Sequence, residues 1–164
     1  MNLNLHDVIG IPSAEKEFSF SPDFSDYSFG SVLSLGDAAA RGRVRNEAGI
    51  LKLEGSLQTS MHCECARCLK EFDKQVDMPV TAVIADELQD EDNPDIFLLN
   101  GDFADLGEVF STAFVLNVDQ RQLCNEDCRG LCDKCGKNLN DGPCSCVPEK
   151  DPRLAVLGQF LEKD

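Results

Sequence analysis

Cysteine is the residue type in this chain whose spacing points most directly to chemistry. Eight of the nine cysteines in the 164 residues fall into four close pairs. The pairs are Cys65 with Cys68, Cys124 with Cys128, Cys132 with Cys135, and Cys144 with Cys146. Four thiolates in a tetrahedron are a preferred ligand set of structural Zn²⁺, and short spacing lets two sulfurs share one ion. The pattern therefore predicts two structural zinc sites with these eight cysteines as ligands.

The last two pairs lie close together in the sequence. Cys135 is followed directly by Gly136, and eight residues separate Cys135 from Cys144. A glycine after the second cysteine can adopt φ > 0, which lets backbone amides turn toward the thiolates. We therefore expect the four cysteines from Cys132 to Cys146 to hold one ion within a nearly self-sufficient loop.

The first two pairs lie far apart and can share the second ion only if the fold brings them together. From Cys68 to Cys124 the chain advances 56 positions (124 − 68). A cross-link over such a length removes much of the conformational entropy of the unfolded chain. Three alternatives remain open: Cys65 and Cys68 are buried free thiols, Cys128 joins Cys132 and Cys135, or Cys63, otherwise a small buried hydrophobe, replaces Cys65.

Catalytic use of the cysteines finds less support in the sequence. A nucleophilic cysteine needs a base, and the chain has two histidines, His6 and His62. His62 precedes Cys63 directly, but adjacent side chains on a strand point to opposite faces. A Cys-x-x-C redox pair is typical of a βαβ context, which this sequence lacks. We therefore predict a non-enzymatic protein without catalytic residues, and keep a thiol-redox or iron–sulfur protein as an alternative.

The charge of the chain limits its partners. A formal net charge of −15 opposes binding of nucleic acid through the average field. Arg41, Arg43 and Arg45 alternate along a predicted strand, so their guanidinium groups share one face. Arginine suits phosphate because its planar fork donates two hydrogen bonds. Two interpretations are open, an RNA-backbone contact or a solvated face paired with nearby acids, and the second is slightly favoured.

The predicted location is the cytoplasm. No run of about 18 apolar residues occurs, so we expect no membrane span. The first seven residues lack the basic and apolar regions of a secretory signal. In a reducing compartment, clustered cysteines are more often metal ligands than disulfides.

The elements that must position the cysteines are mainly strands. Alternating residues predict strands at 17–21, 40–45, 50–62 and 72–85, with a turn at 46–49 between the second and third. The strand 50–62 leads directly into the first cysteine pair. Pro79 predicts an edge position or a bulge in the strand 72–85. The acidic stretch 86–95 predicts a solvated loop.

Two helices complete the prediction. Asp105 and Glu108 form a capping-box pattern, and an apolar stripe then continues to a helix end near Asn117. A short C-terminal helix is predicted from Asp151 onward, with Leu154, Leu157 and Leu161 on one face. We expect an α+β fold, a curved antiparallel β-sheet with a packed helix and a C-terminal cysteine-rich zinc-knuckle lobe. The expected boundaries are 1–122 for the core and 123–164 for the lobe, which form one compact unit.

The order of these motifs resembles the YceD family, the large ribosomal RNA subunit accumulation proteins. The resemblance covers about residues 10–160, and its most specific parts are three segments. They are Cys65-Ala-Arg-Cys68-Leu69, the block from Leu123 to Asn140 with Gly142-Pro-Cys144-Ser-Cys146, and Asp151-Pro-Arg-Leu-Ala-Val-Leu157.

The resemblance implies a cytoplasmic bacterial factor for large-subunit biogenesis that is needed for 23S rRNA accumulation. Genes of the family often lie beside the gene for a small basic zinc-bearing protein of the large subunit. The expected partners are therefore ribosomal RNA, a basic large-subunit ribosomal protein, or both, with no membrane and no small-molecule substrate. An alternative in another class is an acidic holdase for one basic ribosomal protein without RNA contact. The family has no established catalytic residues.

Overall fold

A computed structural model describes residues 1–86 and 95–146 of the protein. In chain order the elements are β1 (Asn2–Asn4), β2 (Glu15–Phe20), β3 (Val32–Leu35), β4 (Ala39–Glu47), β5 (Ile50–Glu64), β6 (Glu71–Ala85), β7 (Ile96–Asn100), β8 (Phe103–Asp105), α1 (Leu106–Asn117) and the 3₁₀ helix η1 (Leu139–Asp141). The predicted C-terminal helix from Asp151 and most of the predicted acidic loop lie outside the described residues.

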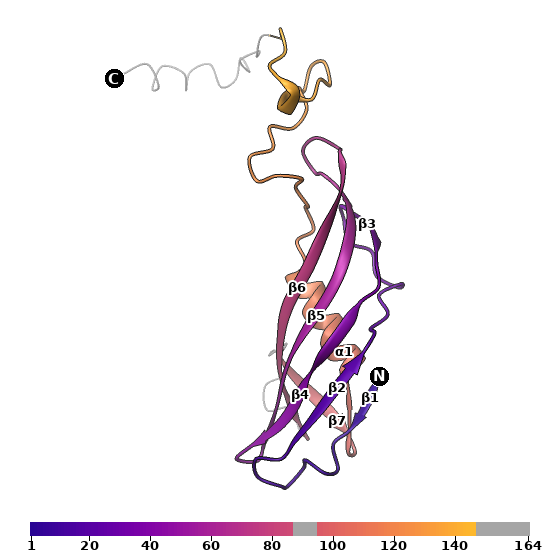
Figure 1. The fold of residues 1–164 in the computed structure, drawn as a ribbon, viewed down its shortest axis with the longest axis vertical. Helices are drawn as coiled ribbons and strands as arrows, with labels where there is room; N and C mark the ends of the chain where they lie inside the picture. Colours follow the sequence, from indigo (N-terminus) through magenta and orange to yellow (C-terminus); the bar gives the residue numbers. More distant parts are fainter. Residues whose placement is uncertain (87–94, 147–164) are drawn as a thin grey trace, which may run out of the picture.

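One eight-stranded sheet dominates the fold (Figure 1). Its order is β1-β8-β7-β6-β5-β4-β2, and β3 pairs with β5 beyond the end of β4. Helix α1 contacts β1 and β6, and Phe110 of α1 packs on the rings of Phe18 and Phe20 in β2. Because strands from both ends of the sheet reach the same helix, the sheet must curve around α1.

The long hairpin of β5 and β6 carries the first cysteine pair beyond the body of the sheet (Figure 1). The strands pair without interruption from Leu51 with Ile84 to Glu64 with Glu71. As the alternation predicts, the residues Leu51, Leu53, Leu57, Thr59 and Met61 on one face of β5 are buried, and Cys63 continues this face. Pro79 lies where β5 alone pairs with β6, because β7 reaches only residues 83–85, and this edge position tolerates a residue without an N–H.

Helix α1 begins where the sequence predicts. The side chain of Asp105 accepts hydrogen bonds from the N–H groups of Gly107 (2.8 Å) and Glu108 (3.4 Å), which would otherwise lack partners in the first turn. The buried face of the helix consists of Leu106, Val109, Phe110 and Phe114. Phe114 packs against Phe24 and Phe29, with ring centroids 4.7 and 5.1 Å apart, so aromatic rings from the N-terminal third complete the core.

The predicted fold class is confirmed, with one refinement. The pair of β6 and β7 is parallel, whereas the other strand pairs are antiparallel, so the sheet is mixed. Strands β1, β3, β7 and β8 were not predicted, because three to five residues are too few to show an alternating pattern. Within residues 1–86 and 95–146, no helix combines the length and the apolar character needed to cross a membrane.

Candidate metal centre

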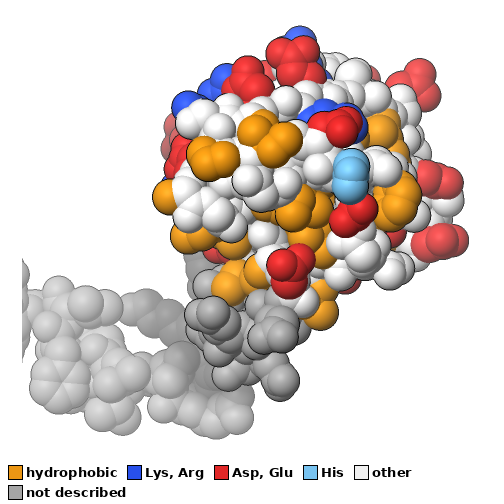
Figure 2. All heavy atoms as spheres, turned by 90° about the horizontal axis from the view of Figure 1, so that it is seen from below, with side chains coloured by type: hydrophobic (Ala, Val, Ile, Leu, Met, Phe, Trp, Pro, Cys, Tyr) orange, Lys and Arg blue, Asp and Glu red, His pale blue; other side chains and the backbone are white. Residues whose placement is uncertain are grey.

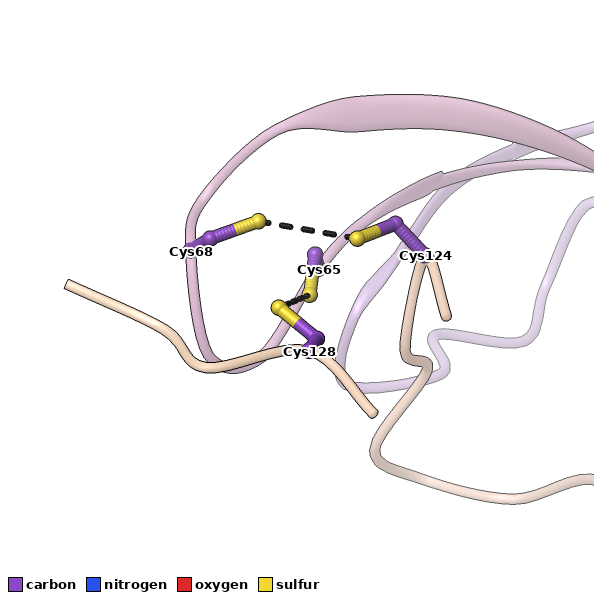
Figure 3. Close-up of side chains that lie close together, drawn as sticks. All are labelled: Cys65, Cys68, Cys124 and Cys128. Carbon is purple, nitrogen blue, oxygen red and sulfur yellow. Dashed lines mark hydrogen bonds between the residues drawn. The ribbon is translucent and has the colours of Figure 1, made fainter. Parts of the chain in front are cut away.

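The first cysteine cluster joins two distant parts of the chain. Cys65 and Cys68 lie in the loop between β5 and β6, and Cys124 and Cys128 lie in the segment that follows α1 (Figure 3). The four Sγ atoms lie within 4.8 Å of one another. Three of these cysteines are buried, and Phe72, Leu123 and Leu131 pack around the cluster. The sequence showed only that these two pairs could share an ion if the fold brought them together, and the fold does bring them together.

The second cluster is local and more exposed. The Sγ atoms of Cys132, Cys135, Cys144 and Cys146 also lie within 4.8 Å of one another. Cys135 is exposed, and Cys144 and Cys146 are half-buried. Lys137 Nζ donates to the carbonyl oxygen of Pro143 (2.9 Å), which ties the two halves of the loop together. The four thiols predicted to share one ion are therefore adjacent.

Both Cys-x-x-C turns have the same backbone hydrogen bonds. In the first, Leu69 N–H donates to the Cys65 carbonyl (2.9 Å), and Cys65 N–H donates to the Lys70 carbonyl (2.9 Å). In the second, Gly136 and Lys137 occupy the positions of Leu69 and Lys70, with distances of 2.9 and 2.8 Å to Cys132. Leu69 and Gly136 both have positive φ, 59° and 71°. This conformation directs amide groups toward the sulfurs.

The sulfur geometry of the first cluster fits one tetrahedral ion. Four thiolates at about 2.3 Å from a metal lie about 3.8 Å from one another, the edge of that tetrahedron. Cys65 Sγ lies 3.8 Å from Cys128 Sγ, and Cys68 Sγ lies 3.6 Å from Cys124 Sγ. All nine cysteines are free thiols. Each cluster can therefore hold one metal ion, with soft sulfur ligands.

The thiols of the first cluster differ in acidity. Burial raises the pKa of Cys65, but N–H groups, chiefly those of Cys124 and Cys68, outweigh it and lower the pKa to about 6. The side-chain amide of Asn140 is the main cause of the lowered pKa of Cys128. Burial, and then the neighbouring thiol of Cys68, raises the pKa of Cys124 to about 12. Adjacent thiolates repel each other, so a cation is needed for all four to ionise.

The second cluster shows the same division. The N–H groups of Cys135 and Lys134 lower the pKa of Cys132 to about 7. The thiol of Cys135, followed by burial, raises the pKa of Cys146 to about 12. Thiols this close to one another hinder each other's ionisation, and a bound cation would allow all four to ionise together.

The positions of the sulfur atoms show which thiols lie together. Cys63 is fully buried in the hydrophobic core, apart from both clusters, and burial is the main cause of its raised pKa. Cys128 groups with Cys65 rather than with Cys132. The structure thus brings together the two predicted sets of four.

Asn140 is a residue of the site that sequence reasoning missed. Its Nδ2 donates to Cys128 Sγ (3.3 Å), although it lies within the loop of the second cluster. Twelve residues separate it from Cys128 in numbering, and no spacing rule connects an amide at that distance with a thiolate. Only the folded loop brings the two side chains together.

The three arginines lie on the exposed face of β4 as predicted, but their surroundings differ. Arg43 pairs with Glu54 (3.2 Å) and Glu15 (3.8 Å) on the neighbouring strands. Arg41 lies opposite Ser19 of β2 and Ser56 of β5. Acidic side chains therefore surround Arg43, whereas hydroxyl-bearing residues lie on either side of Arg41.

Both histidines bond to carboxylates. His62 Nδ1 lies 2.8 Å from Asp73, and its Nε2 lies 3.2 Å from Glu71. His6 Nδ1 lies 3.0 Å from Asp102. These contacts occupy both ring nitrogens of His62 and one of His6. They are the contacts of surface ion pairs rather than of a Cys–His catalytic pair.

Comparison with known proteins identifies relatives of this chain. It is 29% identical over 125 residues to an uncharacterized protein of Mycobacterium tuberculosis (strain ATCC 25618 / H37Rv), covering 73% of the chain. An uncharacterized protein of Mycobacterium bovis shows the same identity and coverage. The chain spans 59% of the length of these relatives. No solved structure matches it.

The family comparison is more informative than the individual relatives. The matched region, residues 53–161, begins within β5 and includes both cysteine clusters. It covers about two thirds of the chain, and the residues that carry the sequence resemblance from Cys65 onward all lie within it. The chain belongs to the YceD family, described as large ribosomal RNA subunit accumulation protein YceD.

Proposed function

We propose that this protein is a non-enzymatic, cytoplasmic factor for biogenesis of the large ribosomal subunit. It supports accumulation of 23S rRNA by binding the RNA, a basic large-subunit ribosomal protein, or both. The observation that carries the proposal is membership of the YceD family through the region that holds both cysteine clusters. The acidic charge of the chain, with Asp and Glu side chains spread over the face drawn in Figure 2, favours a basic protein partner, and Arg41 in β4 supplies a position for phosphate.

In this proposal each cluster holds one structural Zn²⁺. Cys65, Cys68, Cys124 and Cys128 bind the first ion, and Cys132, Cys135, Cys144 and Cys146 bind the second. Sulfur separations of 3.6 and 3.8 Å support a single ion over an iron–sulfur cluster, because a multi-atom cluster holds its thiolates farther apart. Elemental analysis of the reduced protein is expected to give two zinc per chain. One zinc, or iron with inorganic sulfide, contradicts this assignment.

The ions have a structural role. The first would fix the end of the β5–β6 hairpin to the segment after α1, and the second would close the loop from Cys132 to Cys146. We retain the boundary between core 1–122 and lobe 123–164 as a proposal, with both parts in one compact unit. Its support is that two ligands of the first ion belong to each part. A chain that ends at residue 122 is therefore expected to lose both ions.

The RNA contact is assigned to Arg41 rather than to the whole arginine face. Ser19 and Ser56 lie on either side of Arg41, and hydroxyl groups can add hydrogen bonds to a phosphate. Arg43 is already engaged by Glu15 and Glu54 and would have to exchange those partners. Arg41→Ala is expected to weaken binding of a large-subunit rRNA fragment, whereas the matched Arg43→Ala variant is expected to have a smaller effect. Equal losses of rRNA binding in the two variants would contradict the assignment of the contact to Arg41.

The cellular test is depletion of the protein followed by measurement of large-subunit rRNA. We expect 23S rRNA to fall relative to the small-subunit RNA, and restoration by the wild-type gene. Unchanged 23S rRNA on full depletion contradicts the proposed function. Complementation with Arg41→Ala then separates the RNA contact from the other roles of the protein.

A second candidate function is an acidic holdase for one basic ribosomal protein. It is favoured by the net charge of −15 and by the acids around Arg43. Simultaneous replacement of Arg41, Arg43 and Arg45 by alanine distinguishes the two functions. If the triple variant loses rRNA binding that the wild type has, the first function is supported. If the wild type has no affinity for RNA and the triple variant still binds the protein partner, the holdase is supported.

A further inference from the structure

The segment between the two clusters forms a small hairpin that reaches both of them. Residues Leu131 and Asn138 form a β-bridge, Leu139 N–H donates to the Gly130 carbonyl (2.9 Å), and Cys132 N–H donates to the Lys137 carbonyl (2.8 Å). The turn of this hairpin carries Cys132 and Cys135 of the second cluster. Its open end carries Cys128 of the first cluster, with Asn140 opposite. We call residues 128–140 the knuckle hairpin.

The knuckle hairpin packs on the first cluster through its backbone. Leu131 N–H donates to the Arg67 carbonyl (3.1 Å), and Arg67 Nη1 donates to the carbonyls of Cys128 (2.9 Å) and Glu126 (3.2 Å). Gly130 has φ +74°, and a Cβ built there would lie 3.0 Å from the Arg67 carbonyl oxygen. This close approach sets the position of the hairpin relative to the first Cys-x-x-C turn.

Asn140 has a single orientation in this arrangement. Its Oδ1 accepts from the Arg129 N–H (2.8 Å), which can only donate. Its Nδ2 must therefore face the other way, where it donates to Cys128 Sγ (3.3 Å) and Asn138 Oδ1 (2.8 Å). The backbone N–H of Asn140 also donates to Asn138 Oδ1 (3.0 Å). The side chain of Asn138 is therefore oriented with its oxygen toward Asn140. The amide that reaches the first cluster is thus held by the loop of the second.

We propose that Asn140 is a positioning residue that couples the two metal sites. Closing the second cluster around its ion orders the knuckle hairpin, and the ordered hairpin presents the Asn140 amide to the Cys128 thiolate. Hydrogen bonds to a ligand from outside the metal's own shell commonly change metal affinity by about 10- to 100-fold. Because linkage is reciprocal, loading of either site strengthens the other. This inference rests on the proposed ion sites and is independent of the ribosomal role.

Two substitutions at Asn140 separate the donor from the acceptor. Asn140→Ala removes both, whereas Asn140→Asp keeps an oxygen for the Arg129 N–H and places a second oxygen against the Cys128 thiolate. If the donor acts on the metal ligand, the first site weakens about tenfold in Asn140→Ala and more in Asn140→Asp. If Asn140 only anchors the hairpin through Arg129, Asn140→Asp behaves as wild type and Asn140→Ala alone is impaired, which overturns the proposal.

The measurement uses the full chain loaded with ¹¹³Cd²⁺, whose NMR spectrum gives one resonance for each site. Chelator competition then gives the affinity of each site, and Asn117→Ala, an exposed asparagine at the end of α1, serves as the matched control. A wild-type protein that binds fewer than two ions would contradict the proposed sites and overturn the coupling with them, before any variant is compared. Equal first-site affinity in wild type and both Asn140 variants also overturns the proposal.

Coupling is tested by combining Asn140→Ala with Cys135→Ser, which disables the second site. If the second site acts through Asn140, the alanine substitution has a smaller effect on the first site when Cys135 is already replaced. The two changes are expected to be non-additive by about tenfold in first-site affinity. Additive effects would mean that Asn140 supports Cys128 without transmitting the state of the second cluster, and the coupling would be refuted.

Discussion

The two cysteine clusters have the same turn but different surroundings. Both Cys-x-x-C turns use the same two backbone hydrogen bonds and a residue with positive φ. The first cluster is mostly buried and joins Cys68 to a cysteine 56 positions away, whereas the second is more exposed and closes a loop of nine positions (144 − 135). The shared turn brings the thiols of each pair together, and we infer that the rest of the fold would decide how much stability an ion in each cluster provides.

Replacing one ligand in each cluster tests this comparison with the largest expected effect. By the chain-entropy estimate for a cross-link, closing 56 positions stabilises by about 4 kcal/mol and closing nine positions by about 2.5 kcal/mol. Cys68→Ser should therefore lower the free energy of unfolding of the zinc-loaded protein by about 4 kcal/mol. The measurement is urea denaturation followed by far-UV circular dichroism, which reports on the sheet.

Cys135→Ser is the matched variant in the second cluster. Because that loop is local, its loss should free mainly residues 132–146 and change the unfolding of the sheet by less than the estimated 2.5 kcal/mol. Equal losses of sheet stability in the two variants would show that the second cluster contributes as much to the core as the first.

The sequence predicted the second cluster better than the first for a physical reason. The second cluster draws all its thiols from 15 consecutive residues, 132–146. Their local spacing is therefore nearly enough to bring them together. The first cluster depends on the length of the β5–β6 hairpin and on the path of the chain after α1. The buried face of β5 and the start of α1 could also be predicted from the sequence, because periodicity and capping are local properties.

Features that depend on the register between distant strands could not be predicted from the sequence. The engagement of Arg43 by Glu15 and Glu54 requires the alignment of three strands, and the Asn140 contact with Cys128 requires the folded knuckle hairpin. The parallel pairing of β6 with β7 involves only three residue pairs. Patterns along the chain carry no signal for such contacts, since each depends on tertiary placement.

Alanine substitutions at two glycines compare the surroundings of the two Cys-x-x-C turns, because Gly130 packs against the first turn and Gly136 directly follows the second. Gly130 and Gly136 have similar φ values, 74° and 71°, but only at Gly130 does a new Cβ approach another group, the Arg67 carbonyl at 3.0 Å. Left-handed strain costs about 1–2 kcal/mol in either variant. Gly130→Ala should cost more than Gly136→Ala, and it should also weaken the first metal site. Zinc affinity and urea denaturation of both variants provide the test, which a greater loss in Gly136→Ala would contradict.

Leu69 offers a smaller test, because it is the counterpart of Gly136. It has φ 59° and is 56% exposed, so its side chain adds little packing to offset backbone strain. Leu69→Gly removes strain of about 1–2 kcal/mol but gains unfolded-state entropy of about 0.5–1 kcal/mol. We expect a net gain of up to about 1 kcal/mol in the free energy of unfolding. Lys70→Gly, at the next position, is the control and should destabilise; a clear loss in Leu69→Gly would mean that its side chain contributes to the fold.

The smallest predicted effect concerns the base of the first cluster, where His62 joins β5 to β6. Hydrogen bonds to Asp73 and then to Glu71 raise the pKa of His62 above its usual value of 6.5. The folded state therefore binds the proton more tightly than the unfolded state. The contribution of His62 to stability is fully present below about pH 6.5 and is lost as the pH rises through the raised pKa of the folded state.

His62→Gln isolates this contribution, since ionisation of the cysteines affects both proteins alike. The wild type should be more stable than the variant at pH 6, and the difference should shrink as the pH is raised to 9. Urea denaturation of both zinc-loaded proteins across this range gives the difference directly. A difference that grows with pH would mean that neutral His62 is the form favoured by the fold, and that the carboxylates of β6 do not hold the hairpin below the first cluster through charge.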